Sequence, residues 1–242
     1  MKWCLYYPAH EVFAKDMKRF VLFDIDGTLI DPGGAGKRSV TQAFNTVLSV
    51  PDAFAGIALD GKTDIQIIKE GLCAHGLPAG EKAILSIVSE YVKNLKKEIK
   101  KKTKHLMPGV RELLHALQET DGCFLGLLTG NIQQGARIKL GAFDLNEYFP
   151  VGAFGDDHED RNRLLPVAIE NLKKSKGITI DFSDCIVVGD TPLDVQCAKP
   201  YGATCIAVAT GAQQYDELLQ TDADHVLNDL SGAVALFHSL NS

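Results

Sequence analysis

The sequence lacks any apolar run that approaches the roughly 20 residues of a membrane-spanning helix. Its first 16 residues also lack the basic start and the apolar stretch of about 7–15 residues that are typical of a signal peptide. We therefore expect a cytoplasmic protein with no membrane partner. Residues 1–16 are predicted to be an N-terminal extension, and the sequence leaves open whether they pack on the fold or reflect the choice of start site.

Cysteine pairing is also lacking, because none of the six cysteines belongs to a Cys-x-x-Cys motif or to a Cys/His spacing typical of zinc. Cys185 directly precedes the apolar run Ile186–Val188, where a free thiol serves as a small hydrophobic side chain. This usage favours reduced thiols over a disulfide framework and agrees with a cytoplasmic protein.

An excess of positive charge is absent as well, since 25 Lys and Arg face 31 Asp and Glu for a net charge of −6. Nucleic-acid binding needs a basic surface, so no polymeric nucleic acid is expected as a partner. With 242 residues, 45% of them hydrophobic, the chain has the composition of a globular protein. This length predicts one large domain, or a domain with a smaller companion.

Short apolar runs bounded by turn residues alternate with helical patterns through much of the chain. The predicted strands are Phe20–Ile25, Phe124–Leu128, Val151–Phe154, Cys185–Val188, Thr204–Ala209 and His225–Leu227. The predicted helices between them are Gly109–Glu119, Ile132–Leu140, Arg163–Lys174, Pro192–Ala198 and Gln213–Leu219. Such alternation indicates βαβ units, and hence an α/β, Rossmann-like fold with a parallel sheet and helices on both of its faces.

Residues 33–105 interrupt this alternation and contain no convincing strand. Helical patterns lie near Ser39–Leu48, Thr63–His75 and Gly80–Lys101. A segment of this length exceeds an ordinary crossover, so we expect an inserted all-helical cap. The predicted division is a core domain of residues 1–32 and 106–242 and a cap domain of residues 33–105. The glycine-rich stretch Asp31–Gly36 suggests a hinge on which the cap opens and closes.

The most informative motif is Asp24-Ile25-Asp26-Gly27-Thr28, which follows the first predicted strand. Ligands bind in α/β folds where parallel strands end, so both carboxylates are candidates for chemistry. Two neighbouring carboxylates repel each other unless one is protonated or a cation lies nearby. A strand-ending Asx turn, with Gly27 in a tight backbone conformation and Thr28 hydrogen-bonded within it, is the purely structural alternative.

Two other strands end in similar polar motifs. Thr129, Gly130 and Asn131 follow the second strand and precede a helix, whose first N–H groups can bind an anion. Asp190 and Asp194 follow the fourth strand. Each motif alone fits helix capping, but together they predict four carboxylates in one crevice, and an oxygen-rich site of this kind suits Mg²⁺.

The motifs, in this order, resemble the haloacid dehalogenase superfamily from about Arg19 to Asp229, and the insertion after the first motif resembles its helical C1-type cap. By this resemblance Asp24 is the nucleophile that forms an aspartyl-phosphate, and Asp26 is the general acid and base. Thr129 has a catalytic role in holding the phosphoryl group. The resemblance also implies phosphate contacts along the first two motifs, from Gly27, Thr28, Gly130 and Asn131.

Mg²⁺ is the cofactor that this resemblance implies. Its ligands would be the carboxylates of Asp24 and Asp190 and the main-chain carbonyl of Asp26, with Asp194 in or beside the coordination shell. The acid at position 26 favours phosphate esters, because the dehalogenases of the superfamily lack an acid there. It also weakens a phosphonatase interpretation.

The third motif departs from the family, which normally supplies a lysine at a helix start after the third strand. Here the first lysine is Lys173, so Arg161 is predicted to take the cationic catalytic role, with Arg163 as the alternative. A guanidinium can form paired hydrogen bonds to carboxylate and phosphoryl oxygens. Ion pairing of both arginines with the acidic residues 156–160 is the structural alternative.

The expected substrate is a small phosphorylated metabolite, and the expected activity resembles that of phosphoglycolate phosphatases. In the cap, Lys62 could contact an anionic substrate and Asp64 its hydroxyl groups, although Asp64 could equally cap a helix. A sugar phosphomutase of the β-phosphoglucomutase type is the alternative, disfavoured because no arginine-containing recognition motif occurs here. A non-catalytic phosphoryl-accepting regulatory module is a weaker one. The sequence leaves the oligomeric state open.

Overall fold

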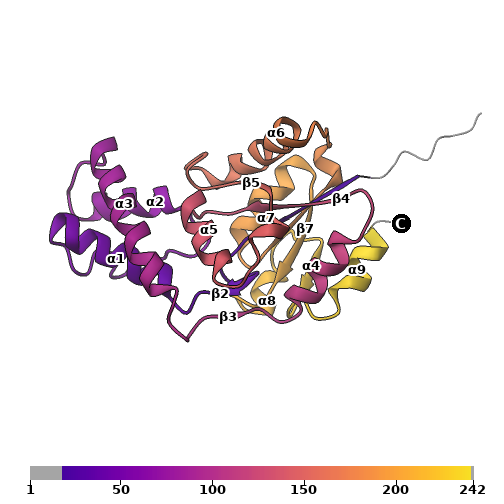
Figure 1. Ribbon diagram of the computed structural model, residues 1–242, viewed down its shortest axis with the longest axis horizontal. Coiled ribbons are helices and arrows are strands. Elements are labelled where there is room, and N and C mark those ends of the chain that lie inside the picture. Colours follow the sequence, from indigo (N-terminus) through magenta and orange to yellow (C-terminus); the bar gives the residue numbers. More distant parts are fainter. Residues whose placement is uncertain (1–17, 241–242) are drawn as a thin grey trace, which may run out of the picture.

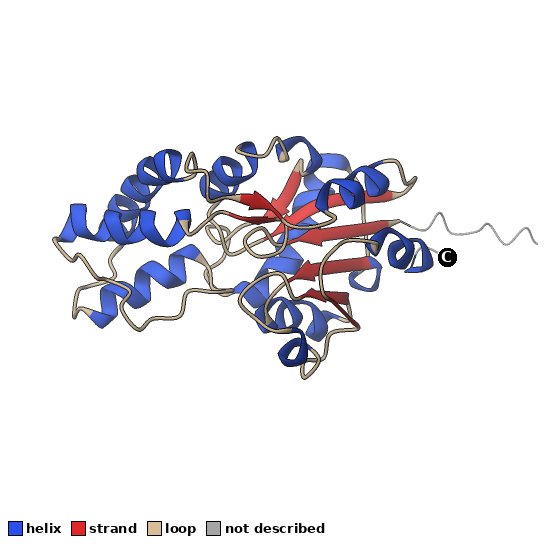
Figure 2. Ribbon diagram, turned by 90° about the horizontal axis from the view of Figure 1, so that it is seen from below, coloured by secondary structure: helices blue, strands red, loops and turns tan. Residues whose placement is uncertain are grey.

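The computed structural model describes residues 18–240, so the predicted extension 1–16 lies outside the described residues. Its centre is a six-stranded parallel sheet in the order β5-β4-β1-β6-β7-β8. The strands are β1 (Arg19–Phe23), β4 (Cys123–Leu128), β5 (Val151–Ala153), β6 (Cys185–Gly189), β7 (Thr204–Val208) and β8 (His225–Leu227). Figure 2 shows these strands between two layers of helices. The predicted α/β, Rossmann-like fold is confirmed.

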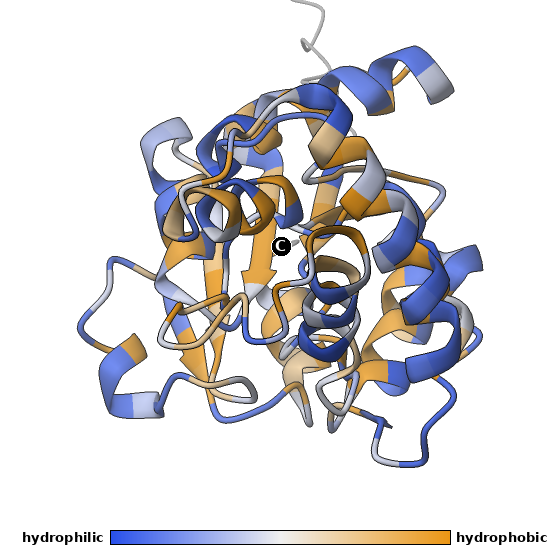
Figure 3. Ribbon diagram, turned by 90° about the vertical axis from the view of Figure 1, so that its left-hand side faces the viewer, coloured by the Kyte–Doolittle hydropathy of each residue, from blue (hydrophilic) through white to orange (hydrophobic). Residues whose placement is uncertain are grey.

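Helices cover both faces because side chains alternate along each strand. In β1, Val21 and Phe23 face an apolar cluster that includes side chains of α4, α5 and α9, whereas Phe20 and Leu22 face one that includes side chains of α6 and α7. The helices of the core are α4 (Val110–Gln118), α5 (Gln133–Gly141), α6 (Leu164–Lys176), α7 (Pro192–Ala198), α8 (Tyr215–Leu218) and α9 (Ala233–Leu240). Short 3-10 helices are η1 (Asn146–Tyr148), η2 (Arg161–Arg163), η3 (Phe182–Asp184) and η4 (Lys199–Tyr201). In Figure 3 the strands are largely hydrophobic, and many surrounding helices present hydrophilic residues outward.

Three helices between β2 and β3 lie together beyond one end of the sheet (Figure 1). They are α1 (Ala35–Leu48), α2 (Asp64–Ala74) and α3 (Glu81–Glu98). They bury an apolar cluster of their own, in which the rings of Phe44 and Phe54 meet edge to face with centroids 4.8 Å apart. This third cluster also contains Ile132 at the start of α5, so the helical insertion packs on the core next to the end of β4.

The connections to this insertion were not predicted as strands. Ile30–Asp31 (β2) pairs antiparallel with His105–Leu106 (β3), so the chain enters and leaves the helical part through two hydrogen-bonded segments. We infer from this pairing and from the separate apolar cluster that, within residues 18–240, the core comprises residues 18–32 and 106–240 and the cap residues 33–105.

Several element boundaries differ from the predicted ones. Helix α1 begins at Ala35 instead of Ser39, strand β1 ends at Phe23, and α9 was not predicted. Among residues 18–240 the structure contains no helix long and apolar enough to cross a membrane. Five cysteines of the predicted thiol set, at 73, 123, 185, 197 and 205, are free, and Cys4 lies outside the described residues.

Two glycines with similar backbone angles provide a test of packing at the start of α4. Gly109 precedes this helix with φ +79°, and a Cβ there would lie 2.2 Å from the carbonyl carbon of Leu230. Gly177 follows α6 with φ +69°, and a Cβ there would meet nothing within 4 Å. We expect Gly177→Ala to lower the free energy of unfolding by about 1 kcal/mol through left-handed strain, and Gly109→Ala to lower it by about 2 kcal/mol more. Urea denaturation measures both, and equal losses would contradict the packing at Leu230.

Candidate active site

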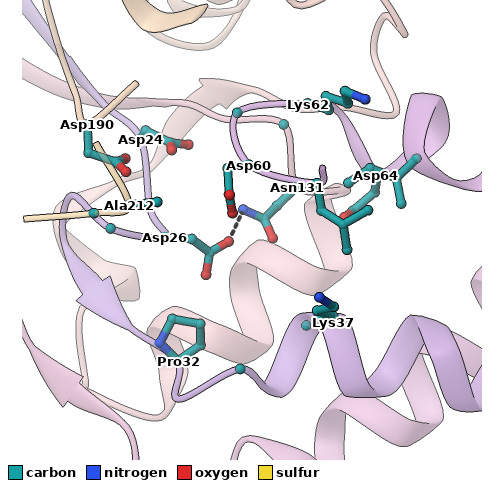
Figure 4. A pocket seen from close by; sticks show the side chains of 18 of the residues that line it. Asp24, Asp26, Pro32, Lys37, Asp60, Lys62, Asp64, Asn131, Asp190 and Ala212 are labelled. Carbon is teal, nitrogen blue, oxygen red and sulfur yellow. Dashed lines mark hydrogen bonds between the residues drawn. The ribbon is translucent and has the colours of Figure 1, made fainter. Parts of the chain in front are cut away.

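The polar side chains predicted from the sequence gather at the carboxyl ends of three adjacent strands. Asp24 follows β1, Thr129 follows β4 and Asp190 follows β6, and parallel pairing brings these three ends together. Asp24 and Asp190 line a cavity of about 500 Å³ that is also lined by residues of the cap, among them Lys37 and Asp64. Figure 4 shows Asp24 and Asp190 side by side in this cavity.

Three buried carboxylates form a compact group. One oxygen each from Asp24, Asp190 and Asp194 lies within 4.8 Å of the others. The pKa of Asp24 is raised to about 6, chiefly by burial and also by Asp194 and Asp26, although Arg161 and a hydrogen bond from Thr129 oppose the increase. Burial, together with Asp24 and Asp194, also raises the pKa of Asp190 well above its usual range. A cluster of this charge calls for a cation, because like charges so close together oppose ionisation.

The donor set fits Mg²⁺. All three groups offer the hard oxygen ligands that this cation prefers. The Oδ1 atom of Asp24 is buried and accepts no hydrogen bond from any group in residues 18–240. Glycines line the Asp190 carboxylate, since a Cβ at Gly27 would lie 2.3 Å from its Oδ2 atom and a Cβ at Gly211 only 1.7 Å from it. We infer that Asp24 and Asp190 would hold the ion.

Asp194 has a different environment. Its Oδ2 atom accepts hydrogen bonds from the backbone N–H of Thr191 (3.1 Å) and from the hydroxyl of Thr191 (2.8 Å), which completes a capping box at the start of α7. Its Oδ1 atom accepts a hydrogen bond from Arg161. Because both oxygens already have donors, Asp194 fits the position beside the metal shell better than a place within it.

Arg161, and not Arg163, lies at the carboxylates. The Arg161 side chain is buried in η2, whereas Arg163 is exposed. The Nη2 atom of Arg161 lies 3.3 Å from Oδ1 of Asp24 and also contacts Asp194. Its Nη1 atom donates to the carbonyl of Gly61 at 2.9 Å. Burial opposes the charge of this guanidinium, but Asp194 and Asp24 raise its pKa overall. Its position agrees with the predicted cationic role.

Asp26 turns away from the acidic group, as Figure 4 shows. Its Oδ2 atom accepts a hydrogen bond from Nδ2 of Asn131 at 2.9 Å and contacts the ammonium group of Lys139. Asn131 also donates to the hydroxyl of Thr129 at 2.9 Å. Sequence reasoning missed Lys139. Its signal was a lysine on the otherwise apolar or small-residue face of α5, three residues after Ala136 and next to Leu140.

The predicted phosphate-binding residues occupy two different positions. Thr28 donates to Oδ1 of Asp190 at 3.0 Å, so it orients a carboxylate, and its contact with phosphate stays a prediction. Gly27 has φ +84°, a conformation that suits glycine. Gly130 lies directly under the cap, where a Cβ would be 2.2 Å from the carbonyl oxygen of Lys62.

The two predicted cap residues have partners within the protein. The ammonium of Lys62 pairs with Glu70 at 2.6 Å and points away from Asp24 and Asp26 in Figure 4. Asp64 accepts a hydrogen bond from the backbone N–H of Ile132 at 2.9 Å, and the hydroxyl of Tyr91 also hydrogen-bonds to it. Asp64 thus fastens the cap to the start of α5, and substrate contacts of both residues stay predictions.

Metal binding is tested by thermal unfolding. Mg²⁺ at about 100 times its Kd should raise the Tm of the wild type by about 5 °C, because it stabilises only the folded state. Asp190→Asn should lose this increase, yet unfold no earlier than the wild type in EDTA, since the substitution removes one of three repelling carboxylates. Asp222→Asn, at an exposed aspartate, is the control. An undiminished Mg²⁺ effect in Asp190→Asn would contradict the assignment.

The pH dependence of stability tests the environment of Asp64. Burial raises the pKa of Asp64 to about 6, with Lys139 and the Ile132 N–H opposing the shift. The folded state therefore binds this proton more tightly than the unfolded state, so its contribution to stability falls as the pH rises from about 4 to 6. Asp64→Asn keeps the acceptor for Ile132 and should remove up to about 3 kcal/mol of this decline.

Urea denaturation between pH 4 and 7 measures the decline for both proteins. Asp216→Asn, on the exposed face of α8, controls for the loss of one charge. Parallel pH profiles of Asp64→Asn and the wild type would show that Asp64 is not the group responsible.

Comparison with known proteins places the chain among relatives of similar length. It is 27% identical to the probable phosphatase IndB of Dickeya dadantii over 231 residues, which cover 93% of this chain and 95% of the relative. It is also 27% identical to the phosphoglycolate phosphatase of Escherichia coli over 246 residues, which cover 92% of this chain and 95% of that protein. The predicted similarity to phosphoglycolate phosphatases is confirmed.

Solved structures share the fold. A predicted phosphatase from Clostridium acetobutylicum superposes with a TM-score of 0.68 at 21% identity, covering 92% of this chain and 99% of the other. CbbY from Rhodobacter sphaeroides, solved in complex with phosphate, superposes with a TM-score of 0.69 at 17% identity, covering 90% of this chain and 96% of the other. A sequence model of the haloacid dehalogenase-like hydrolases matches residues 21–208. The chain therefore belongs to the haloacid dehalogenase-like hydrolase family, and is an enzyme of the hydrolase class.

Proposed function

We propose that this enzyme is a Mg²⁺-dependent phosphatase that hydrolyses a small phosphorylated metabolite through an aspartyl-phosphate at Asp24. One observation carries the proposal: Asp24 and Asp26 line the same cavity in contrasting environments. Asp24 is buried beside a guanidinium and two carboxylates, whereas the Asp26 side chain is 34% exposed and is held by an amide and an ammonium group. Two acids in different environments can serve as nucleophile and as proton donor.

The side chains divide the reaction between them. Asp24 attacks phosphorus, while Arg161 stabilises the charge on the nucleophile and on the transferred group. Asp26 gives a proton to the leaving oxygen and later takes one from the attacking water. Thr129 and the backbone of Gly130 and Asn131 orient the phosphoryl oxygens. Bound Mg²⁺ supplies charge neutralisation and orientation of the phosphoryl group.

The substrate that we propose is a small phosphate ester of the phosphoglycolate type. The names of several full-length relatives support this class. A cavity of about 500 Å³ covered by the cap is in the range expected for a metabolite. We also place the enzyme in the cytoplasm, where its free cysteines would stay reduced.

A sugar phosphomutase of the β-phosphoglucomutase type is the alternative. A putative β-phosphoglucomutase from Thermotoga maritima shares the fold, with a TM-score of 0.59 at 19% identity, covering 92% of this chain and 99% of the other. A mutase must rebind a phosphorylated sugar, and the ammonium group of Lys62, the basic residue of the Gly61–Asp64 loop at the cavity, is already paired with Glu70 at 2.6 Å. This pairing favours hydrolysis. The presence of Asp26 and of a cap disfavours a non-catalytic phosphoryl-accepting module.

Turnover of a phosphometabolite panel with and without Mg²⁺ tests the proposal. The panel includes phosphoglycolate and β-glucose 1-phosphate, with inorganic phosphate and glucose 6-phosphate measured as alternative products. Asp24→Asn keeps the shape of the side chain but removes the nucleophile, so kcat should fall by at least about 10³-fold. More than a tenth of wild-type activity in this variant would refute the role of Asp24. Release of glucose 6-phosphate without inorganic phosphate would favour the mutase.

A further inference from the structure

The geometry points to Lys139 as a positioning residue: it holds the Asp26 carboxyl group in one orientation through its Oδ2 atom. This inference rests on the proposed function. Lys139 belongs to none of the motifs from which the site was predicted, which follow the strands of the sheet. The residue comes from the last turn of α5, eight positions after Asn131 in the chain.

The ammonium group of Lys139 is buried and has two partners within the protein. Its side chain is 4% exposed, and its Nζ atom contacts Oδ2 of Asp26 and lies 2.5 Å from Oδ1 of Asn131. A buried charge is costly unless it is paired and hydrogen-bonded, so these two partners explain how a lysine is tolerated on the inner face of α5. Because an unpaired buried charge is unfavourable, the ammonium group should stay beside Asp26 and Asn131.

The two oxygens of Asp26 are consequently unequal. Oδ2 accepts hydrogen bonds from both the ammonium group of Lys139 and the side-chain amide of Asn131. Oδ1 is buried and accepts no hydrogen bond from any group in the described part of the chain. The orientation of the Asp26 carboxyl group is therefore set at Oδ2, by these two donors.

The cap contributes space for Lys139. Gly36, in the first turn of α1, lacks a side chain at the point where a Cβ would lie 3.3 Å from Nζ of Lys139. Since α1 belongs to the cap, the ammonium lies between the core carboxylate and the helix that covers it. This placement shields the Lys139 ammonium group from water, which strengthens its interaction with the Asp26 carboxylate.

The role in the reaction follows from where the protons go. When an oxygen of Asp24 bonds to phosphorus, the bond between phosphorus and the leaving oxygen breaks, and the proton of the Asp26 carboxyl group moves to that oxygen. The carboxylate formed on Asp26 is already paired with Lys139. In the second half, water attacks phosphorus, its proton moves to the Asp26 carboxylate, and the bond to Asp24 breaks.

The dependence on the leaving group tests this role. An alkyl phosphate, such as phosphoglycolate, needs a proton on its leaving oxygen, whereas 2,4-dinitrophenyl phosphate releases a stable anion. Lys139→Met should lower kcat by about 10²-fold on the alkyl ester and by no more than about threefold on the dinitrophenyl ester. Lys139→Arg, which keeps a cation at Asp26, should recover part of the alkyl-ester activity. Lys174→Met, on an exposed lysine of α6, is the matched control.

A loss of the same factor on both esters would overturn the inference, because a merely structural role lowers both rates equally. Crystal structures of Lys139→Met and Lys139→Arg give a second readout: Asp26 should leave its present orientation in the first and keep it in the second. An unmoved Asp26 in Lys139→Met would also overturn the inference. If the wild type hydrolyses neither ester, the proposed function fails, and the crystal structures still decide the positioning role.

Discussion

The buried guanidinium of Arg161 is the interaction on which the site depends. Three carboxylates at the ends of neighbouring strands would repel one another in a space this small, and Arg161 contacts two of them. The same side chain donates to the carbonyl of Gly61 in the cap. One cation thus joins Asp24, the start of α7 and the cap, so the electrostatics of the core and the position of the cap are set together.

Much of the core site could be predicted because it follows from strand ends. In a parallel sheet, residues just after adjacent strands share one edge, so Asp24, Thr129 and Asp190 were found from local patterns alone. Arg161 was found from its place after the next strand. Lys139 was missed because its importance depends on a contact with Asp26, 113 positions away, which no local pattern reveals. The pairing of β2 with β3 was also missed. It is a contact between distant parts of the chain, and strands of only two residues leave no recognisable pattern in the sequence.

From the sequence, helix capping and a role in the site were treated as alternatives for the acidic residues at helix starts, but the structure does not separate them. Asp194 closes a capping box and also holds Arg161, so both interpretations of this residue describe the same side chain. Asp64 was expected to bind substrate or to cap its own helix, yet it accepts from the N–H of Ile132 at the start of a different helix. Carboxylates at helix starts therefore connect the parts of this protein, because backbone N–H groups there lack partners within their own helix.

The two-residue strands β2 and β3 have a mechanical consequence. A cap attached through two hydrogen-bonded segments cannot twist freely about either one, because independent rotation would break the pairing of Ile30 with Leu106 and of Asp31 with His105. The two connections are therefore constrained to move together, and the helical unit is joined to the core as if through a single paired segment.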